Sequence, residues 1–264
     1  MQRVNYPEPE HSTDATITPA DLRAVRALLA QRGLPAELVL QIIDGAEYYP
    51  VVRASLRGPS TLNAQQGCAK SGGSCAARCR LLSPPLPGPE PGETWRVRKV
   101  VWEIESRDQG WGGESPGTFR GAYSWYEACI VRPQQEGDDD SPPTSDGTTD
   151  PADERSAALA QWMSTRKKYC SSADALPDLE AVGYTLVPNN SAAASGSSPP
   201  PTSGSSSVTA SRSAKADVNG YGSGAGFLEA LRPGDRVALW MRAQYPGWAN
   251  TVAGASVEIV YDVC

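Results

Sequence analysis

The sequence predicts a mostly β protein: an antiparallel β-sandwich, jelly-roll-like, with a helical hairpin in front and long disordered insertions. One observation is alternation near the C-terminus, where every second residue from 257 to 263 is apolar. Another is the turn residues that separate several such short stretches, which is typical of a sandwich. The third is composition: 39% hydrophobic residues with 25 Gly and 23 Pro allow only a modest core.

The N-terminal part predicts a disordered tail over residues 1–17 and a helical hairpin over residues 18–50. Thr18 caps the first helix, Pro19 suits its first position and Asp21 completes a capping box. Gly33 ends this helix, and Pro50 is expected to end the second. The second helix has its apolar residues at helical spacing: Leu38, Val39, Ile42 and Ile43. Because two short amphipathic helices cannot bury their apolar stripes alone, the hairpin should dock on the sandwich or on a partner.

The second helix begins with a motif, "LPAELVLQI", that resembles the opening of an F-box. The matching residues are Leu34, Pro35, Glu37, Leu38, Leu40 and Ile42. In that family the segment binds a Skp1-like adaptor of ubiquitin ligases, so the resemblance implies partner-binding roles for Leu34, Pro35, Leu38 and Ile42. The likeness covers less than a tenth of the chain, and the later F-box helices are not evident. The alternative is an ordinary capped helix packed on its own domain.

Residues 51–264 are predicted to form one β-sandwich domain. Alternation, β-branched residues and aromatic residues predict strands at 94–106, 122–132, 182–187, 236–243 and 254–263. Residues 155–170 are expected to form a short helix. Tracts rich in Pro, Gly, Ser and acidic residues predict insertions near 63–93, 134–155 and 189–216. Doubling a loop costs only about 0.6 kcal/mol, so one modest sandwich can carry these insertions.

Two segments combine Trp with Gly and polar side chains just past a predicted strand: Ser106–Gly113 and Arg242–Asn250. If both lie at one edge of the sandwich, aromatic rings could stack on a sugar or peptide while carboxylates and amides bind its polar groups. The candidate ligand-binding residues are Asp108, Gln109, Trp111, Tyr245, Trp248 and Asn250. The alternative is structural: a Trp in a Gly-rich corner closes the sandwich edge, and Asp108 caps a turn.

Several function classes are disfavoured by composition. The net charge of −6 and the pI near 5.0 argue against nucleic-acid binding. The single histidine, His11, lies in the predicted tail, and no nucleotide-binding or nucleophile motif occurs, so we expect no enzyme and no cofactor. Cys68, Cys75 and Cys79 do not have the paired CxxC spacing of zinc sites, so we expect no metal.

The predicted location is cytoplasmic or nuclear. No stretch approaches the roughly 20 apolar residues that a membrane helix needs. The N-terminus lacks the apolar region of a signal peptide. In such a compartment most cysteines should be reduced.

The blocks "RKVVWEIESRDQGWGG", "YSWYEA", "LRPGDRVALWMRAQYPGWAN" and "VEIVY" together resemble a family of fungal proteins of unassigned activity. Those proteins share the Asp-Gln-Gly-Trp stretch and the Pro-Gly-Asp-Arg and Pro-Gly-Trp-x-Asn blocks, often with a similar Leu-Pro-x-Glu-Leu helix in front. The resemblance covers about half of the chain and implies one recurring fold without a known reaction. We therefore predict a non-enzymatic recognition protein whose sandwich binds a protein or glycan and whose hairpin recruits an adaptor. The alternative is a carbohydrate-binding lectin with purely structural helices.

Overall fold

The computed structural model describes residues 16–64, 75–107, 123–134, 151–187, 204–211 and 226–264, with only the backbone described for 107, 151 and 204–211. The chain divides into two compact units, Met1–Val51 and Val52–Cys264, close to the boundary predicted after residue 50. The helices are α1 (Pro19–Gln31), α2 (Ala36–Gly45), α3 (Pro151–Ser164), η1 (Ala173–Ala175), α4 (Leu176–Glu180) and α5 (Phe227–Ala230). The strands are β1 (Val51–Asn63), β2 (Cys75–Leu82), β3 (Trp95–Arg107), β4 (Ser124–Pro133), β5 (Tyr184–Val187), β6 (Gly204–Ser211), β7 (Arg236–Gln244) and β8 (Ala249–Val263).

The first unit contains the predicted helical hairpin. The Thr18 hydroxyl accepts a hydrogen bond from the Asp21 backbone N–H, and the Asp21 carboxylate accepts one from the Thr18 N–H, which confirms the capping box. The predicted end of the second helix at Pro50 was wrong. α2 ends at Gly45, and Glu47 then adopts a left-handed backbone with φ 46°, which no helix can continue.

Burial divides the apolar residues of α2 into two groups. Val39 and Ile43 are buried, as is Leu22 of α1. Leu38, Leu40 and Ile42 are instead 44%, 43% and 46% exposed. Of the predicted stripe of Leu38, Val39, Ile42 and Ile43, only Val39 and Ile43 are therefore buried.

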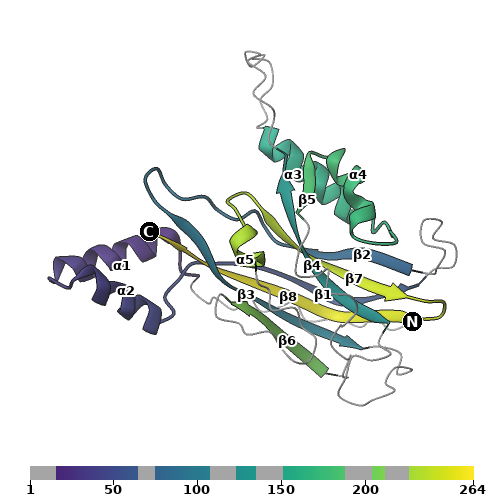
Figure 1. Ribbon diagram of the computed structural model, residues 1–264, viewed down its shortest axis with the longest axis horizontal. Coiled ribbons are helices and arrows are strands. Elements are labelled where there is room, and N and C mark those ends of the chain that lie inside the picture. Colours follow the sequence, from purple (N-terminus) through teal and green to yellow (C-terminus); the bar gives the residue numbers. More distant parts are fainter. Residues whose placement is uncertain (1–15, 65–74, 108–122, 135–150, 188–203, 212–225) are drawn as a thin grey trace, which may run out of the picture. The chain divides into compact units, whose positions relative to one another are not determined.

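The second unit is the predicted antiparallel β-sandwich, shown in Figure 1. One sheet has the strand order β1-β8-β3-β6 and the other has β2-β7-β4-β5. This is the order of an eight-stranded jelly roll, in which consecutive strands lie in opposite sheets except for β4 and β5, which pair with each other. It pairs strands that are far apart in the chain: β3 with β8 and β4 with β7.

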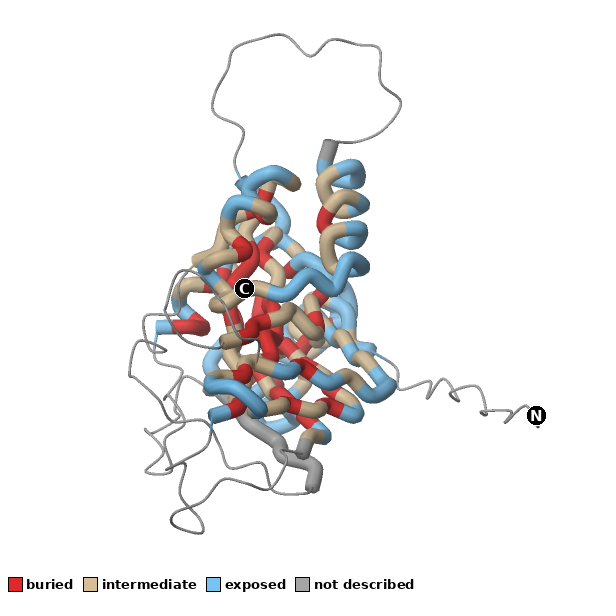
Figure 2. Tube along the Cα trace, turned by 90° about the vertical axis from the view of Figure 1, so that its right-hand side faces the viewer, coloured by how far each residue is buried: buried red, intermediate tan, exposed pale blue. Residues whose placement is uncertain are grey.

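Alternating residues of the strands form the sandwich core, visible as the red segments of Figure 2. In β8 the predicted apolar face, Val257, Ile259, Tyr261 and Val263, is buried. The predicted face of β3 lies in register beside it, since Val100 pairs with Ile259 and Trp102 with Val257. The alternation read from the sequence therefore identifies the core of this sheet correctly.

A helical layer covers the other face of the β2-β7-β4-β5 sheet. Leu159 of α3 and Leu179 of α4 pack with Val131, Ala238 and Trp240 of the sheet. The Trp240 ring lies 6.1 Å from that of Trp162 and 6.0 Å from that of Tyr169, between centroids. The helix itself was predicted, but its place on the sheet was not. Both faces of β7 are buried because of this layer.

Three described elements lie inside stretches that were predicted to be insertions. They are β2, within 63–93; the start of α3, within 134–155; and β6, within 189–216. The prediction was wrong for β2 and for the start of α3, whereas a weak strand over 208–218 was also predicted and overlaps β6. β2 pairs with β7, and β6 pairs with β3. Such pairing is formed by backbone hydrogen bonds, about which amino-acid composition gives no information.

Candidate functional site

The turn that joins β7 to β8 follows from its sequence, Tyr245-Pro246-Gly247-Trp248. The Trp248 N–H donates to the Tyr245 carbonyl over 3.3 Å, which closes a four-residue turn. Pro246 occupies the second position, and Gly247 has φ 86° at the third, as in a type II turn. Tyr245 also has a left-handed backbone, with φ 70°, although it is not glycine. Such a conformation costs of order 1 kcal/mol or more.

Three aromatic side chains meet at this turn, and we call them the aromatic cluster: Tyr123, Tyr245 and Trp248. The Tyr123 ring centroid lies 4.7 Å from that of Tyr245 and 5.2 Å from that of Trp248, both edge-to-face. Tyr123 is 37% exposed, Tyr245 is 45% exposed and Trp248 is half-buried. The cluster therefore presents aromatic surface to solvent at one end of the sandwich.

Backbone hydrogen bonds hold the aromatic cluster in place. The Gln244 N–H donates to the Tyr123 carbonyl over 2.8 Å, which ties the start of β4 to the end of β7. The Ala64 N–H donates to the Trp248 carbonyl over 2.9 Å, which ties the end of β1 to the turn. The rings thus project from a backbone that is fixed on two sides, and a ligand would meet a preorganised surface.

Asn250 has a structural position beneath the turn. It is 3% exposed, and its side-chain oxygen accepts a hydrogen bond from the Tyr126 hydroxyl over 2.6 Å. Its amide nitrogen donates to the carbonyls of Trp125, over 2.9 Å, and Arg242, over 3.2 Å. Its polar atoms thereby link β8 to β4 and β7, across the two sheets. Burial raises the pKa of Tyr126 to about 12, so this hydroxyl stays a neutral donor.

Next to Asn250, a charged network neutralises the one carboxylate of β4. Arg242 Nη1 donates to both oxygens of Glu127, over 2.7 and 2.8 Å, while its guanidinium lies 5.1 Å from the centre of the Trp125 ring. Trp125 Nε1 and the Ser172 hydroxyl also donate to Glu127. With four donated bonds, this carboxylate serves to hold the network together. The nearby Cys129 thiol is held neutral, since burial raises its pKa to about 12.

The structure brings together only part of the predicted ligand site. Tyr245 and Trp248 lie in the aromatic cluster, whereas Asn250 lies below it. Asp108, Gln109 and Trp111 lie outside the described residues. The described chain stops before them at Arg107, whose backbone pairs with Thr251, and resumes at Tyr123. Both points adjoin the β7–β8 turn.

Tyr123 was missed as a candidate residue. The signal was present in the sequence, because Tyr123 opens the aromatic block "YSWYEA". Of the predicted partner-binding residues, Leu34 is half-buried, while Pro35, Leu38 and Ile42 are exposed on the hairpin.

Within the described part of the chain, no group of three or more His, Cys, Asp or Glu residues could hold a metal ion. The helices described there include none that is long and apolar enough to cross a membrane. Cys79 and Cys129 are not disulfide-bonded, whereas Cys170 is.

Comparisons with known proteins add no assignment: no family model, no curated protein and no solved structure matches the chain significantly. The resemblance to fungal proteins and to an F-box therefore stays a prediction.

Proposed function

We propose that this is a recognition protein without catalytic chemistry, whose sandwich binds a glycan or protein partner at the aromatic cluster. The observation that carries the proposal is the exposure of Tyr123 and Tyr245 at the β7–β8 turn, on a backbone fixed by hydrogen bonds. Burying such rings stabilises a complex by about 25 cal/mol per Å² of apolar surface.

Two properties of the cluster support a binding role over a purely structural one. The rings leave a large part of their surface open, although an aromatic corner that only closed the sandwich would bury it. Tyr245 is also held in a left-handed conformation that glycine would adopt without strain. Strained residues of this kind are concentrated at functional sites.

The test is a glycan array and a partner capture with the full chain, run beside Tyr245→Ala and Trp248→Ala. We expect a ligand that the wild type binds and that each variant binds at least tenfold more weakly. Tyr48→Ala, a half-buried tyrosine of the other unit, is the control and should bind like the wild type. A ligand retained equally by all variants would contradict the proposal.

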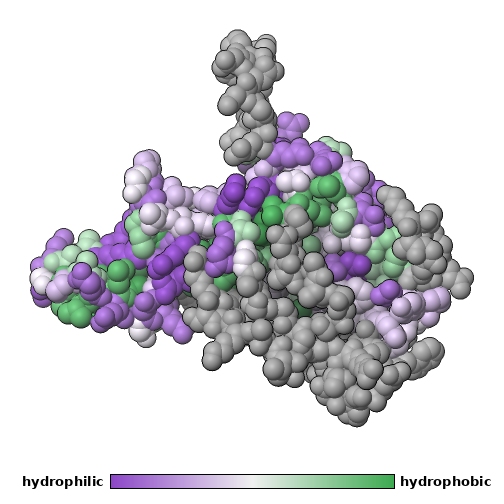
Figure 3. All heavy atoms as spheres, in the orientation of Figure 1, coloured by the Kyte–Doolittle hydropathy of each residue, from purple (hydrophilic) through white to green (hydrophobic). Residues whose placement is uncertain are grey.

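A second candidate function rests on the hairpin, which we propose as a docking element for a Skp1-like adaptor. Leu38, Leu40 and Ile42 match the F-box opening and are exposed, and Figure 3 shows hydrophobic patches on the α1–α2 hairpin. An exposed apolar helix face is what helix-in-groove docking requires. This form of the protein would work in the cytoplasm or nucleus.

The experiment is a pull-down with the purified adaptor. Leu38→Asp and Ile42→Asp should abolish capture, whereas Gln41→Asp adds the same charge at an exposed position of α2 and should not. Capture that survives Leu38→Asp would refute this role.

A further inference from the structure

Three guanidinium groups gather at the open edge of the sandwich, where edge strand β2 faces edge strand β1. Arg78 donates from Nη2 to the Ser60 hydroxyl, over 2.5 Å, and to the Thr61 carbonyl, over 3.1 Å. Arg80 donates to the Gly58 carbonyl over 2.5 Å. Arg166, just past the end of α3, acts electrostatically on both. We call these three residues the arginine group.

The charge of the arginine group is not neutralised within the described part of the chain. The hydrogen bonds of Arg78 and Arg80 go to neutral oxygens only, and Arg80 Nε is buried without a partner. Arg166 is exposed and forms no ion pair there. Burial first, and then the neighbouring cations, lower the pKa of Arg78 and of Arg80. Like charges held together in a protein with net charge −6 favour an anionic ligand.

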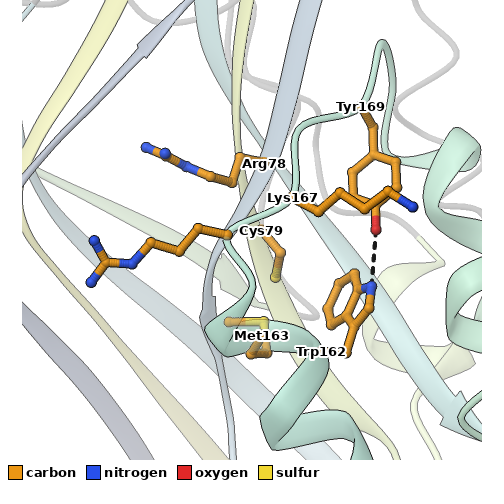
Figure 4. A pocket seen from close by; sticks show the side chains of 7 residues that line it. Arg78, Cys79, Trp162, Met163, Lys167 and Tyr169 are labelled. Carbon is orange, nitrogen blue, oxygen red and sulfur yellow. Dashed lines mark hydrogen bonds between the residues drawn. The ribbon is translucent and has the colours of Figure 1, made fainter.

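A recess opens beside the arginine group. It is a small recess open to solvent, and it is lined by Arg78, Cys79, Trp162, Met163, Arg166, Lys167 and Tyr169. Figure 4 shows Tyr169 and Trp162 joined by a hydrogen bond on one side, with Lys167 next to Tyr169, while Arg78 extends in the opposite direction. Lys167 is already paired, since its ammonium lies 2.5 Å from Asp178. Trp162 and Tyr169 thus lie on one side of the recess, while the Arg78 guanidinium points away from them and bonds to β1.

A structural explanation covers only part of this arrangement. Cations just past a helix C-terminus interact favourably with the helix dipole, by about 0.3–1 kcal/mol, which explains Arg166 after α3. It does not explain Arg78 and Arg80, which lie on a strand and are partly desolvated. Guanidinium groups are suited to phosphate, because their planar donors match its oxygens.

We propose that Arg78, Arg80 and Arg166 form a binding site for a tetrahedral oxyanion, the phosphate or sulfate group of a monoester whose organic part contacts Trp162 and Met163. The site shares no residue with the aromatic cluster and stands independently of the function proposed for it. Binding an ester of either acid requires no chemical step.

The test is calorimetric titration of the full chain with inorganic phosphate, phenyl phosphate and phenyl sulfate at constant ionic strength. Phenyl phosphate should bind more tightly than inorganic phosphate, and the ratio of phenyl phosphate to phenyl sulfate affinity identifies which oxyanion is preferred. Arg78→Gln and Arg166→Gln should each weaken binding at least fivefold. Arg53→Gln, which removes an exposed arginine of β1 from its pair with Glu258, should leave binding unchanged.

Arg166→Gly separates binding from folding. Arg166 has φ 51°, which glycine adopts without strain, so this variant should unfold at the same denaturant concentration or a higher one. It should nevertheless lose the anion affinity. If Arg166→Gly binds phenyl phosphate as tightly as the wild type, or if Arg53→Gln weakens binding equally, the site does not exist as proposed.

Discussion

The two sheets of the sandwich differ in what covers their outer faces. The β2-β7-β4-β5 sheet carries α3 and α4, so that Ala238 and Trp240 are as buried as Val237 and Leu239. The β1-β8-β3-β6 sheet leaves charged side chains such as Arg53, Glu103 and Glu258 exposed or partly exposed on its outer face. The same fold thus contains one sheet that is buried on both faces and a second sheet that is buried on its inner face only. This difference shows that the polarity of alternate residues in a strand depends on whether a second layer covers that face of the sheet, and not on strand formation itself.

The largest effect on stability is expected for the loss of Trp240, whose ring packs between the β2-β7-β4-β5 sheet and the helices that cover it. Trp240→Ala removes a fully buried ring from between the sheet and Trp162 and should destabilise the protein by about 3–5 kcal/mol. Glu258→Ala, on the open face of β8, should change stability by less than about 0.5 kcal/mol. Urea unfolding followed by fluorescence measures both. Similar losses for the two variants would remove the distinction between the faces.

A smaller effect is expected at the ion pair between Arg132 and Asp235. Asp235 accepts bidentate bonds of 2.8 Å from Arg132 and a third from the Arg232 N–H, at 1% side-chain exposure. Asp235→Asn leaves the Arg132 charge without its partner and should cost about 2–4 kcal/mol. The measurement is the urea midpoint at constant m-value. A loss below about 1 kcal/mol would show that solvent already screens this pair.

Next comes the link between the sheets at Tyr126 and Asn250. Tyr126→Phe leaves the Asn250 oxygen without this donor and should cost about 1–2 kcal/mol at neutral pH. Because the folded pKa of Tyr126 is raised to about 12, the unfolded chain loses its proton first as the pH rises through about 10. The stabilisation is therefore complete below pH 10 and declines toward pH 12.

The check on this prediction is urea unfolding of both proteins from pH 8 to pH 12. The difference in unfolding free energy between wild type and Tyr126→Phe should shrink above pH 10. A constant difference across this range would mean that Tyr126 titrates normally in the folded state.

The smallest effect is expected for the exposed pair of Arg53 and Glu258. Both side chains are 45% exposed, at a distance of 2.7 Å between Arg53 Nε and Glu258 Oε1. Arg53→Gln should cost at most about 1 kcal/mol, and less at high salt. Comparison with Asp235→Asn in the same salt series would sharpen the contrast between the two sheets. If Arg53→Gln and Asp235→Asn lowered the unfolding free energy equally and independently of salt, this contrast would be contradicted.

Part of the candidate site could be predicted because its signal is local. The Pro-Gly turn places Tyr245 and Trp248 together through four consecutive residues, and the capping box of Thr18 and Asp21 needs only three helical steps. Tyr123 reaches the same cluster only because β4 pairs with β7. Asn250 is the opposite case. As an amide beside the turn it was predicted to contact a ligand, but strand pairing surrounds it with three hydrogen-bond partners inside the protein.

The sequence by itself determined the strand periodicity, the β7–β8 turn and the start of the hairpin, since alternation, turn residues and caps act over a few neighbouring positions. Only the tertiary structure decided that β2 is a strand, that helices cover one sheet, and that Arg78, Arg80 and Arg166 meet at an edge. These features depend on backbone pairing and on packing between residues far apart in the chain, for which no local pattern exists.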